Sequence, residues 1–325
     1  MDKTGYVCKG MNRRFFEAAK SGNVRAVNEI SPLWSVANEL LQLSNANLED
    51  GMTFLKAKNM EGNTALHEAA LGGSEQVVNA LLEFCPDLVN EINQAGERAL
   101  FKACEGGQVK IVEMLCPPTP MSMEYYKRSD GQTPLHLAVS KLSTDVIEKL
   151  LHHKPELATE VDNFDRSPLH MAALLPYLDN FLYPKLYRKI FLTGKMLIRN
   201  DGGLSCYKVD QNKQSALHVA VKEGNAALVD VILYYCRDCL EMVDNDGRIA
   251  LHLAVNNAAE IFLRSEGHHL KFIIYSVTSE RLINCIDNKG QTALDIALEK
   301  QNDDPQLYRA VSDLILNELK LFGSF

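Results

Sequence analysis

Hydrophobic and polar positions between Asn59 and Ile92 follow a pattern that predicts a turn and then two short helices. Gly62 supplies the positive φ that the turn requires, and Thr64 stands where a helix N-cap belongs. The pair Gly72-Gly73 can adopt the left-handed conformation that ends the first helix, and Pro86 ends the second. The apolar face of the first helix is formed by Ala65, Leu66, Ala69 and Ala70, and that of the second by Val77, Val78, Leu81 and Leu82. One such helix pair cannot bury its own apolar faces, so the pattern predicts a stack of copies.

The same unit recurs along almost the whole chain. A four-residue signature at the start of the first helix marks each copy, and successive signatures begin 34, 35, 34, 48, 34 and 43 residues apart. An eighth copy, without its turn, opens the chain between Arg13 and Val24. The signatures are Thr64-Ala-Leu-His67, Arg98-Ala-Leu-Phe101, Thr133-Pro-Leu-His136, Ser167-Pro-Leu-His170, Ser215-Ala-Leu-His218, Ile249-Ala-Leu-His252 and Thr292-Ala-Leu-Asp295.

A period near 33 residues, a leading turn and a T-P-L-H signature are typical of ankyrin repeats. Over residues 12–300 the chain resembles the ankyrin-repeat family on all of these features. The resemblance implies an all-α solenoid of about eight helix-turn-helix repeats with β-hairpin-like turns. It also implies a non-catalytic scaffold that binds protein partners.

The intervals between signatures suggest a domain organisation. We expect a flexible N-terminus over residues 1–11, the repeat domain over 12–300, and a C-terminal capping helix within 301–325. The repeat domain should contain expansions near 31–56, 176–205 and 258–270, because the spacing or the periodic pattern breaks there. Within the last segment, apolar residues at helical spacing predict a helix over Pro305 to Leu321.

The ends of two second helices carry a further resemblance. Cys85-Pro-Asp-Leu88 and Lys154-Pro-Glu-Leu157 share a P-[DE]-L ending that resembles plant ankyrin proteins of the accelerated-cell-death type. In that family the repeats usually precede a membrane domain, which is missing from this sequence. The resemblance implies a role in plant stress or immune signalling. The alternative is a cytosolic regulatory part of a membrane-associated, channel-like assembly.

Composition restricts the function further. A net charge of −8 at pH 7 points away from nucleic acid as a partner, and 46% hydrophobic residues are ordinary for a folded protein. No apolar run reaches the roughly 18 residues that a membrane span needs, and the N-terminus has no signal-peptide pattern. We therefore expect a cytosolic or nuclear protein that meets a membrane only through a partner.

The histidines and cysteines are expected to be structural. Five histidines occupy the last position of the signature, each a whole repeat from the next, and the family resemblance implies that they link neighbouring repeats by hydrogen bonds. Cys236-Arg-Asp-Cys239 has the spacing of a metal or redox motif but lacks a second pair. We interpret the cysteines as reduced, packed thiols and expect no metal site, no cofactor, no small-molecule substrate and no catalytic residue.

Candidate binding residues come from two places. In ankyrin proteins the turn tips and the exposed side of the first helices contact partners, and insertions often extend a binding face. The residues expected to contact a partner are Met60, Glu61, Asn63, Gln94, Glu97, Asp130, Gln132, Phe164, Arg166, Asp246 and Arg248 at the turns, and Tyr183, Lys185, Arg188 and Lys189 in the insertion.

The insertion between Tyr177 and Arg199 is basic and aromatic in an otherwise acidic chain. Two interpretations remain open from the sequence. The segment could dock on an anionic lipid surface or an acidic partner, or its aromatic residues could fold back onto the stack.

Overall fold

A computed structural model describes residues 17–22, 56–116, 122–175, 184–257, 280–302 and 304–321. The predictions for the N-terminus at 1–11, for the expansion at 31–55, for the expansion at 258–270 and for Tyr183 lie outside these ranges. The described chain forms two compact units, Met1–Lys154 and Pro155–Phe325, and each is considered by itself. Both consist of helices joined by turns, with one isolated β-bridge between Val209 and Ser215 in the described part.

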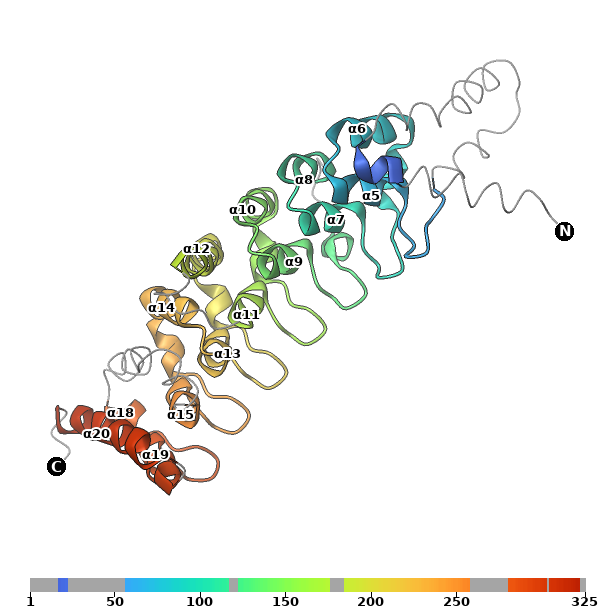
Figure 1. The fold of residues 1–325 in the computed structure, drawn as a ribbon. Helices are drawn as coiled ribbons and strands as arrows, with labels where there is room; N and C mark the ends of the chain where they lie inside the picture. The colour runs from blue at the N-terminus through green and yellow to red at the C-terminus, as the bar shows by residue number, and fades with distance from the viewer. Residues whose placement is uncertain are drawn as a thin grey trace, which may run out of the picture. The chain divides into compact units, whose positions relative to one another are not determined.

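In the first unit, the inner helices form one row and the outer helices form a second row beside it (Figure 1). The inner row comprises α5 (Ala65–Gly72), α7 (Ala99–Glu105) and α9 (Pro134–Ser140). The outer row comprises α6 (Glu75–Phe84), α8 (Val109–Leu115) and α10 (Thr144–His153), and the 3₁₀ helices are η1 (Pro86–Asn90) and η2 (Met123–Tyr126). Helices of one row pack on each other from repeat to repeat, as the period predicts.

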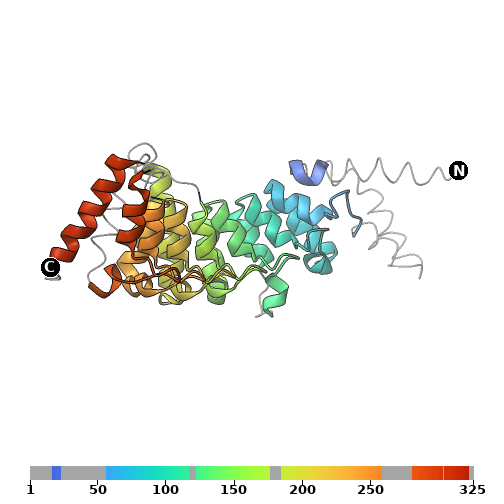
Figure 2. The same ribbon diagram turned by 90° about the horizontal axis from the view of Figure 1, so that it is seen from below.

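The second unit repeats this arrangement. Its inner helices are α11 (Pro168–Ala173), α13 (Ala216–Lys222), α15 (Ala250–Asn256) and α19 (Ala293–Glu299), and its outer helices include α12 (Pro184–Asn200) and α14 (Ala226–Tyr235). The remaining elements are η3 (Pro155–Thr159), η4 (Leu204–Tyr207), η5 (Arg237–Glu241), α18 (Glu280–Ile283), η6 (Lys300–Asn302) and α20 (Pro305–Leu321). Helix α20 lies against α19 and buries Leu307, Val311 and Ile315, so the predicted terminal helix is confirmed (Figure 2).

Burial explains why the chain folds this way. The alanines of each inner helix are inaccessible to solvent, as Ala65, Ala69 and Ala70 are in α5, and this lets neighbouring inner helices approach closely. Gly73 adopts φ 82° and ends α5 in the left-handed conformation, as the sequence predicts. The expected all-α stack of helix-turn-helix repeats is therefore confirmed. None of the helices in the ranges that the structure describes is long and apolar enough to cross a membrane.

Candidate functional site

Six of the described turns are held by the Asn or Asp side chain that leads them. In the turn before α11, Asp162 Oδ1 accepts hydrogen bonds from the backbone amides of Phe164 and Arg166, at 2.9 and 3.0 Å. Asn59, Asn93, Asp210, Asp244 and Asp287 do the same in their own turns. Neighbouring turns are also joined through their backbones, because Gln94 N donates to Glu61 O at 3.1 Å. The turn tips are consequently fixed in position before any partner arrives.

The signature histidines link one repeat to the next. His67 Nδ1 accepts a hydrogen bond from Thr64 N at 3.2 Å, so its Nε2 carries the proton and donates to Glu97 O of the following repeat, at 2.9 Å. His170, His218 and His252 make the equivalent bonds to the carbonyls of Gln214, Arg248 and Gln291. Burial lowers the pKa of all four rings, which keeps them neutral. The structural role expected for these histidines is confirmed.

In the last repeat Asp295 replaces the histidine. Its Oδ2 accepts hydrogen bonds from the backbone amide and the hydroxyl of Thr292, at 2.8 and 2.7 Å. The carboxylate thus satisfies the helix N-terminus in the same way as the imidazole Nδ1 does elsewhere.

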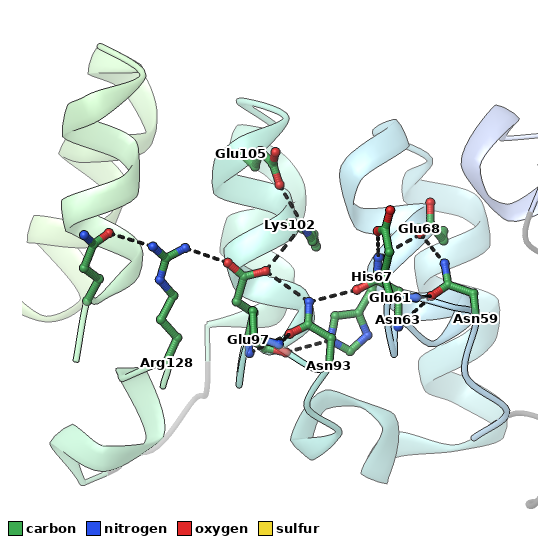
Figure 3. Close-up of polar contacts among 12 residues, drawn as sticks. Asn59, Glu61, Asn63, His67, Glu68, Asn93, Glu97, Lys102, Glu105 and Arg128 are labelled. Carbon is green, nitrogen blue, oxygen red and sulfur yellow. Dashed lines mark hydrogen bonds and ion pairs between the residues drawn. The ribbon is translucent and has the colours of Figure 1, made fainter. Parts of the chain in front are cut away.

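A ladder of polar side chains runs across the turns of the first unit (Figure 3). Asn63 donates to Glu68 and accepts from Asn93 Nδ2 at 2.9 Å, and Asn93 Nδ2 also donates to Glu97 at 3.0 Å. Arg128 then bonds the other oxygen of Glu97 at 2.8 Å. We refer to these five side chains as the polar ladder. It connects three successive turns through buried or half-buried groups.

Glu97 is the centre of the polar ladder. Burial opposes its ionisation, but hydrogen bonds from Asn93 and Arg128 and the charge of Lys102, whose Nζ lies 3.3 Å from Oε2, outweigh burial and lower the pKa of the carboxyl. Lys102 in turn pairs with Glu105 at 2.9 Å. The charge of Glu97 is therefore neutralised within the chain rather than offered to a partner.

The predicted turn residues of the first unit consequently separate into three groups by their burial. Asn63 and Glu97 are only 1% and 6% exposed and belong to the polar ladder. Asp130 and Gln132 are half-buried and accept hydrogen bonds from Arg128. The remaining three, Met60, Glu61 and Gln94, are exposed, and Met60 reaches 95% exposure at a turn tip.

In the second unit the two predicted arginines are tied to the leading aspartates of their turns. Arg166 donates to Asp162 Oδ2 through Nε and Nη2, at 2.9 and 2.7 Å, and Arg248 repeats this with Asp244 at 3.0 and 2.8 Å. Burial opposes ionisation of these aspartates, but the arginines and the turn amides outweigh it and lower both pKa values. Asp246 pairs with Arg248 at 2.6 Å and stays largely exposed.

Phe164 and Arg166 border a cavity of about 250 Å³ between the turns and inner helices of two consecutive repeats. The Arg166 guanidinium stacks on the Phe164 ring at 4.7 Å, and Phe164 is 55% exposed. The rest of the lining combines apolar and charged groups, namely His170, Leu174, Asp210, Gln211, Asn212, Gln214, Val219, Lys222 and Glu223.

Comparison with known proteins agrees with this geometry. A family model described as "Ankyrin repeats (3 copies)" matches residues 15–122 and 192–272, together more than half of the chain. The chain belongs to the ankyrin-repeat family. A second model, "Ankyrin repeat", matches residues 130–162. The ankyrin repeats make this chain a protein–protein interaction scaffold.

Individual relatives are distant. The chain is 24% identical over 195 residues to a mouse (Mus musculus) B-cell lymphoma 3 protein homolog, which covers 57% of this chain and 40% of that protein. It is 25% identical over 183 residues to the probable 26S proteasome regulatory subunit p28 of Saccharomyces cerevisiae, covering 56% of this chain and 69% of that protein. The crystal structure of the human ASB11 ankyrin repeat domain shares 22% identity, covers 74% of this chain and 90% of that one, and superposes with a TM-score of 0.48.

The basic segment of the ankyrin chain forms helix α12, which occupies the outer-helix position of its repeat beside α14 (Figure 1). The aromatic residues of α12 are half-buried, and the hydroxyl of Tyr187 donates to Asp230 of α14. Lys185, Arg188 and Lys189 are exposed. From Pro184 onward, therefore, the aromatic side of the segment folds back onto the stack while the basic side faces solvent.

The thiols of the CxxC motif pack against the preceding repeat. Cys236 Sγ lies 3.9 Å from Gly203 O, and Cys239 Sγ donates to Cys206 O at 3.5 Å. All cysteines in the described ranges are free, and burial raises the pKa of the Cys116 thiol to about 11. The described residues contain no cluster of three or more His, Cys, Asp or Glu side chains that could hold a metal ion.

Some residues that line the cavity were not among the predicted binding residues. Lys222 and Glu223 lie four and five residues after the signature histidine of α13 and line the cavity together with Asp210. The spacing from His218 could have identified Lys222, because residues four apart share one side of a helix, but not Glu223, which caps the helix end.

Proposed function

We propose that this ankyrin scaffold is non-catalytic and holds a protein partner along its turn tips and inner helices, with a partner side chain entering the cavity of the second unit. The main support for this proposal is the cavity beside Phe164 and Arg166. Its 250 Å³ corresponds to about eight water molecules at roughly 30 Å³ each, which is room for one large side chain. The lining combines the apolar groups of Leu174 and Val219 with charged groups, which suits a side chain with an apolar stem and a polar end.

The rigidity of the turns supports binding of this kind. Backbone bonds between successive turns, such as Gln211 N to Phe164 O at 3.3 Å, fix the rim of the cavity. A preformed surface loses little conformational entropy on binding, so a modest set of contacts gives useful affinity. Arginine is among the residue types that most often dominate the energy of protein interfaces. Arg166, stacked on the exposed ring of Phe164, is such a residue.

Affinity capture with a matched pair of variants tests the proposal. Phe164→Asp places a charge at the rim of the cavity, whereas Tyr234→Asp changes a residue that is 77% exposed on the outer helix α14. A protein captured by the unaltered chain should be lost with Phe164→Asp and retained with Tyr234→Asp. Retention by Phe164→Asp together with loss by Tyr234→Asp would place the interface on the outer helices and refute the proposal.

The setting of the interaction is a further proposal. We propose a cytoplasmic protein in plant stress or immune signalling, supported by the resemblance of the P-[DE]-L endings to plant ankyrin proteins. These endings form η1 and η3 and bury Leu88 and Leu157. Fractionation of the source cells before and after pathogen challenge would test the setting. A chain confined to a different compartment, with unchanged partners after challenge, would count against it.

A further inference from the structure

The exposed side of α12 carries a concentration of positive charge that no ion pair within the described part of the chain neutralises. At 100° per residue, all five cations of the helix fall within about 120° of its circumference, opposite the buried residues. They are Lys185, Arg188, Lys189, Lys195 and Arg199, and we call them the basic stripe. The helix contains no acidic residue, and none of the five cations forms an ion pair with another residue in the described ranges.

The outer helices of the first unit behave differently. Lys110 of α8 pairs with Glu75 of α6 at 3.2 Å, and Lys149 of α10 pairs with Glu113 of α8. The lysines on those helices are thus paired with a carboxylate of the neighbouring repeat. Next to α12, the corresponding helix α14 offers only Asp230, and its carboxylate accepts the hydroxyl of Tyr187.

The arrangement of the basic stripe is unfavourable for α12 itself. Lys185 lies in the first turn, where the positive end of the helix dipole repels cations. Lys185 and Lys189, and likewise Lys195 and Arg199, are like charges four residues apart, which destabilises a helix. Packing of α12 against α14 offsets the repulsion among these charges. Gly194 allows an approach so close that a Cβ added there would lie 2.6 Å from Leu228 Cδ1. An anionic ligand along the stripe would relieve the repulsion.

We propose that the basic stripe binds an extended acidic segment of a partner protein. From Lys185 to Arg199 the stripe spans about 21 Å at 1.5 Å per residue. An extended peptide of about six or seven residues covers that length at roughly 3.3 Å per residue. A bilayer is a poorer match, because helices that lie in a membrane interface insert an apolar face. The apolar face of α12 is packed inside the protein, and only Leu192, 37% exposed, lies within the stripe.

Fluorescence anisotropy with the full chain and a fluorescein-labelled heptaglutamate peptide tests this proposal. The variant Lys185→Glu/Arg188→Glu/Lys189→Glu should bind the peptide about 3- to 125-fold more weakly, because it removes three exposed charge contacts that are worth roughly 1.4- to 5-fold in affinity each. The control Lys141→Glu/Lys208→Glu/Lys289→Glu makes the same change in net charge at exposed positions elsewhere and should bind as the unaltered chain does.

Two further measurements make the result decisive. The conservative variant Lys185→Arg/Arg188→Lys/Lys189→Arg should retain binding, and circular dichroism should show equal helix content in all variants. Equal peptide binding by the stripe variant and the control would overturn the proposal. Stripe-dependent binding to phosphatidylserine vesicles or to a single-stranded oligonucleotide, without binding to the peptide, would also overturn it by assigning the stripe to another class of ligand.

Discussion

Replacement of Glu97 by alanine should loosen the turn and inner helix that the polar ladder holds together. The substitution removes the acceptor for Asn93 Nδ2 at 3.0 Å and for Arg128 Nη1 at 2.8 Å, and it removes the anion 3.3 Å from Lys102 Nζ. Removing one partner of a fully buried ion pair costs about 3–5 kcal/mol, whereas an exposed pair contributes about 1 kcal/mol at most.

The cost of Glu97→Ala should lie between these two values, because the partners that lose the carboxylate are partly exposed. The side chain of Glu97 is 7% exposed, while those of Arg128 and Lys102 are 23% and 16% exposed and can regain some hydration. We therefore expect a loss of about 2–3 kcal/mol in local stability. Because about 1.4 kcal/mol corresponds to a factor of ten, the amides of α7 should exchange with deuterium about 30- to 140-fold faster.

Hydrogen–deuterium exchange measured by mass spectrometry gives this ratio directly, at a pH where local opening and reclosing are fast relative to the chemical exchange step. Glu105→Ala is the matched control, because Glu105 also pairs with Lys102 but is 37% exposed. It should accelerate exchange in α7 by no more than about fivefold, as expected for an exposed ion pair. If Glu97→Ala has no larger effect than Glu105→Ala, the polar ladder does not stabilise the turns and the reasoning fails.

Three further predictions follow from the same contacts. Because burial lowers the pKa of the signature histidines in α5, α11, α13 and α15, the unfolded chain takes up protons more readily, so stability should be lost as pH falls below about 6.5; a urea midpoint unchanged between pH 7.5 and pH 5.5 would contradict this. Gly62→Ala should destabilise the chain by about 1–3 kcal/mol more than Gly290→Ala. Both glycines have positive φ, but the new Cβ would lie 2.7 Å from Gln94 N at Gly62 and would meet nothing within 4 Å at Gly290. Equal urea midpoints for the two variants would refute this close approach. Gly194→Ala should cost about 1–2 kcal/mol through overpacking against α14, whereas the exposed Arg199→Ala should stay within about 0.5 kcal/mol of the unaltered chain, as thermal unfolding would show.

The repeats could be predicted from the sequence because each depends on local signals. A glycine at the turn, a small-residue face on the inner helix and a signature at its start act within one repeat, and the repetition identifies them. The role of His67 was predictable for the same reason, since a residue that recurs at each period belongs to the scaffold.

Long-range contacts account for what the sequence did not reveal. Asn63 and Glu97 occupy turn positions that are usually solvated, and their burial depends on Asn93 and Arg128 in neighbouring turns. Arg128 occupies the position that Asn or Asp holds in other turns. Nothing in the local sequence shows that its side chain bonds Glu97 of the preceding repeat. The position of α12 in the outer row could not be predicted either. Its repeat lacks, after Ala173, the Gly-containing sequence that marks where the second helix begins in other repeats.

Binding of a partner to the turn-tip and inner-helix face should leave a hydrogen-exchange footprint on the complex. Partner binding should slow exchange in residues 163–166, 210–214 and 219–223 of the second unit. Slower exchange confined to outer helices such as α14, with these three segments unchanged, would contradict it.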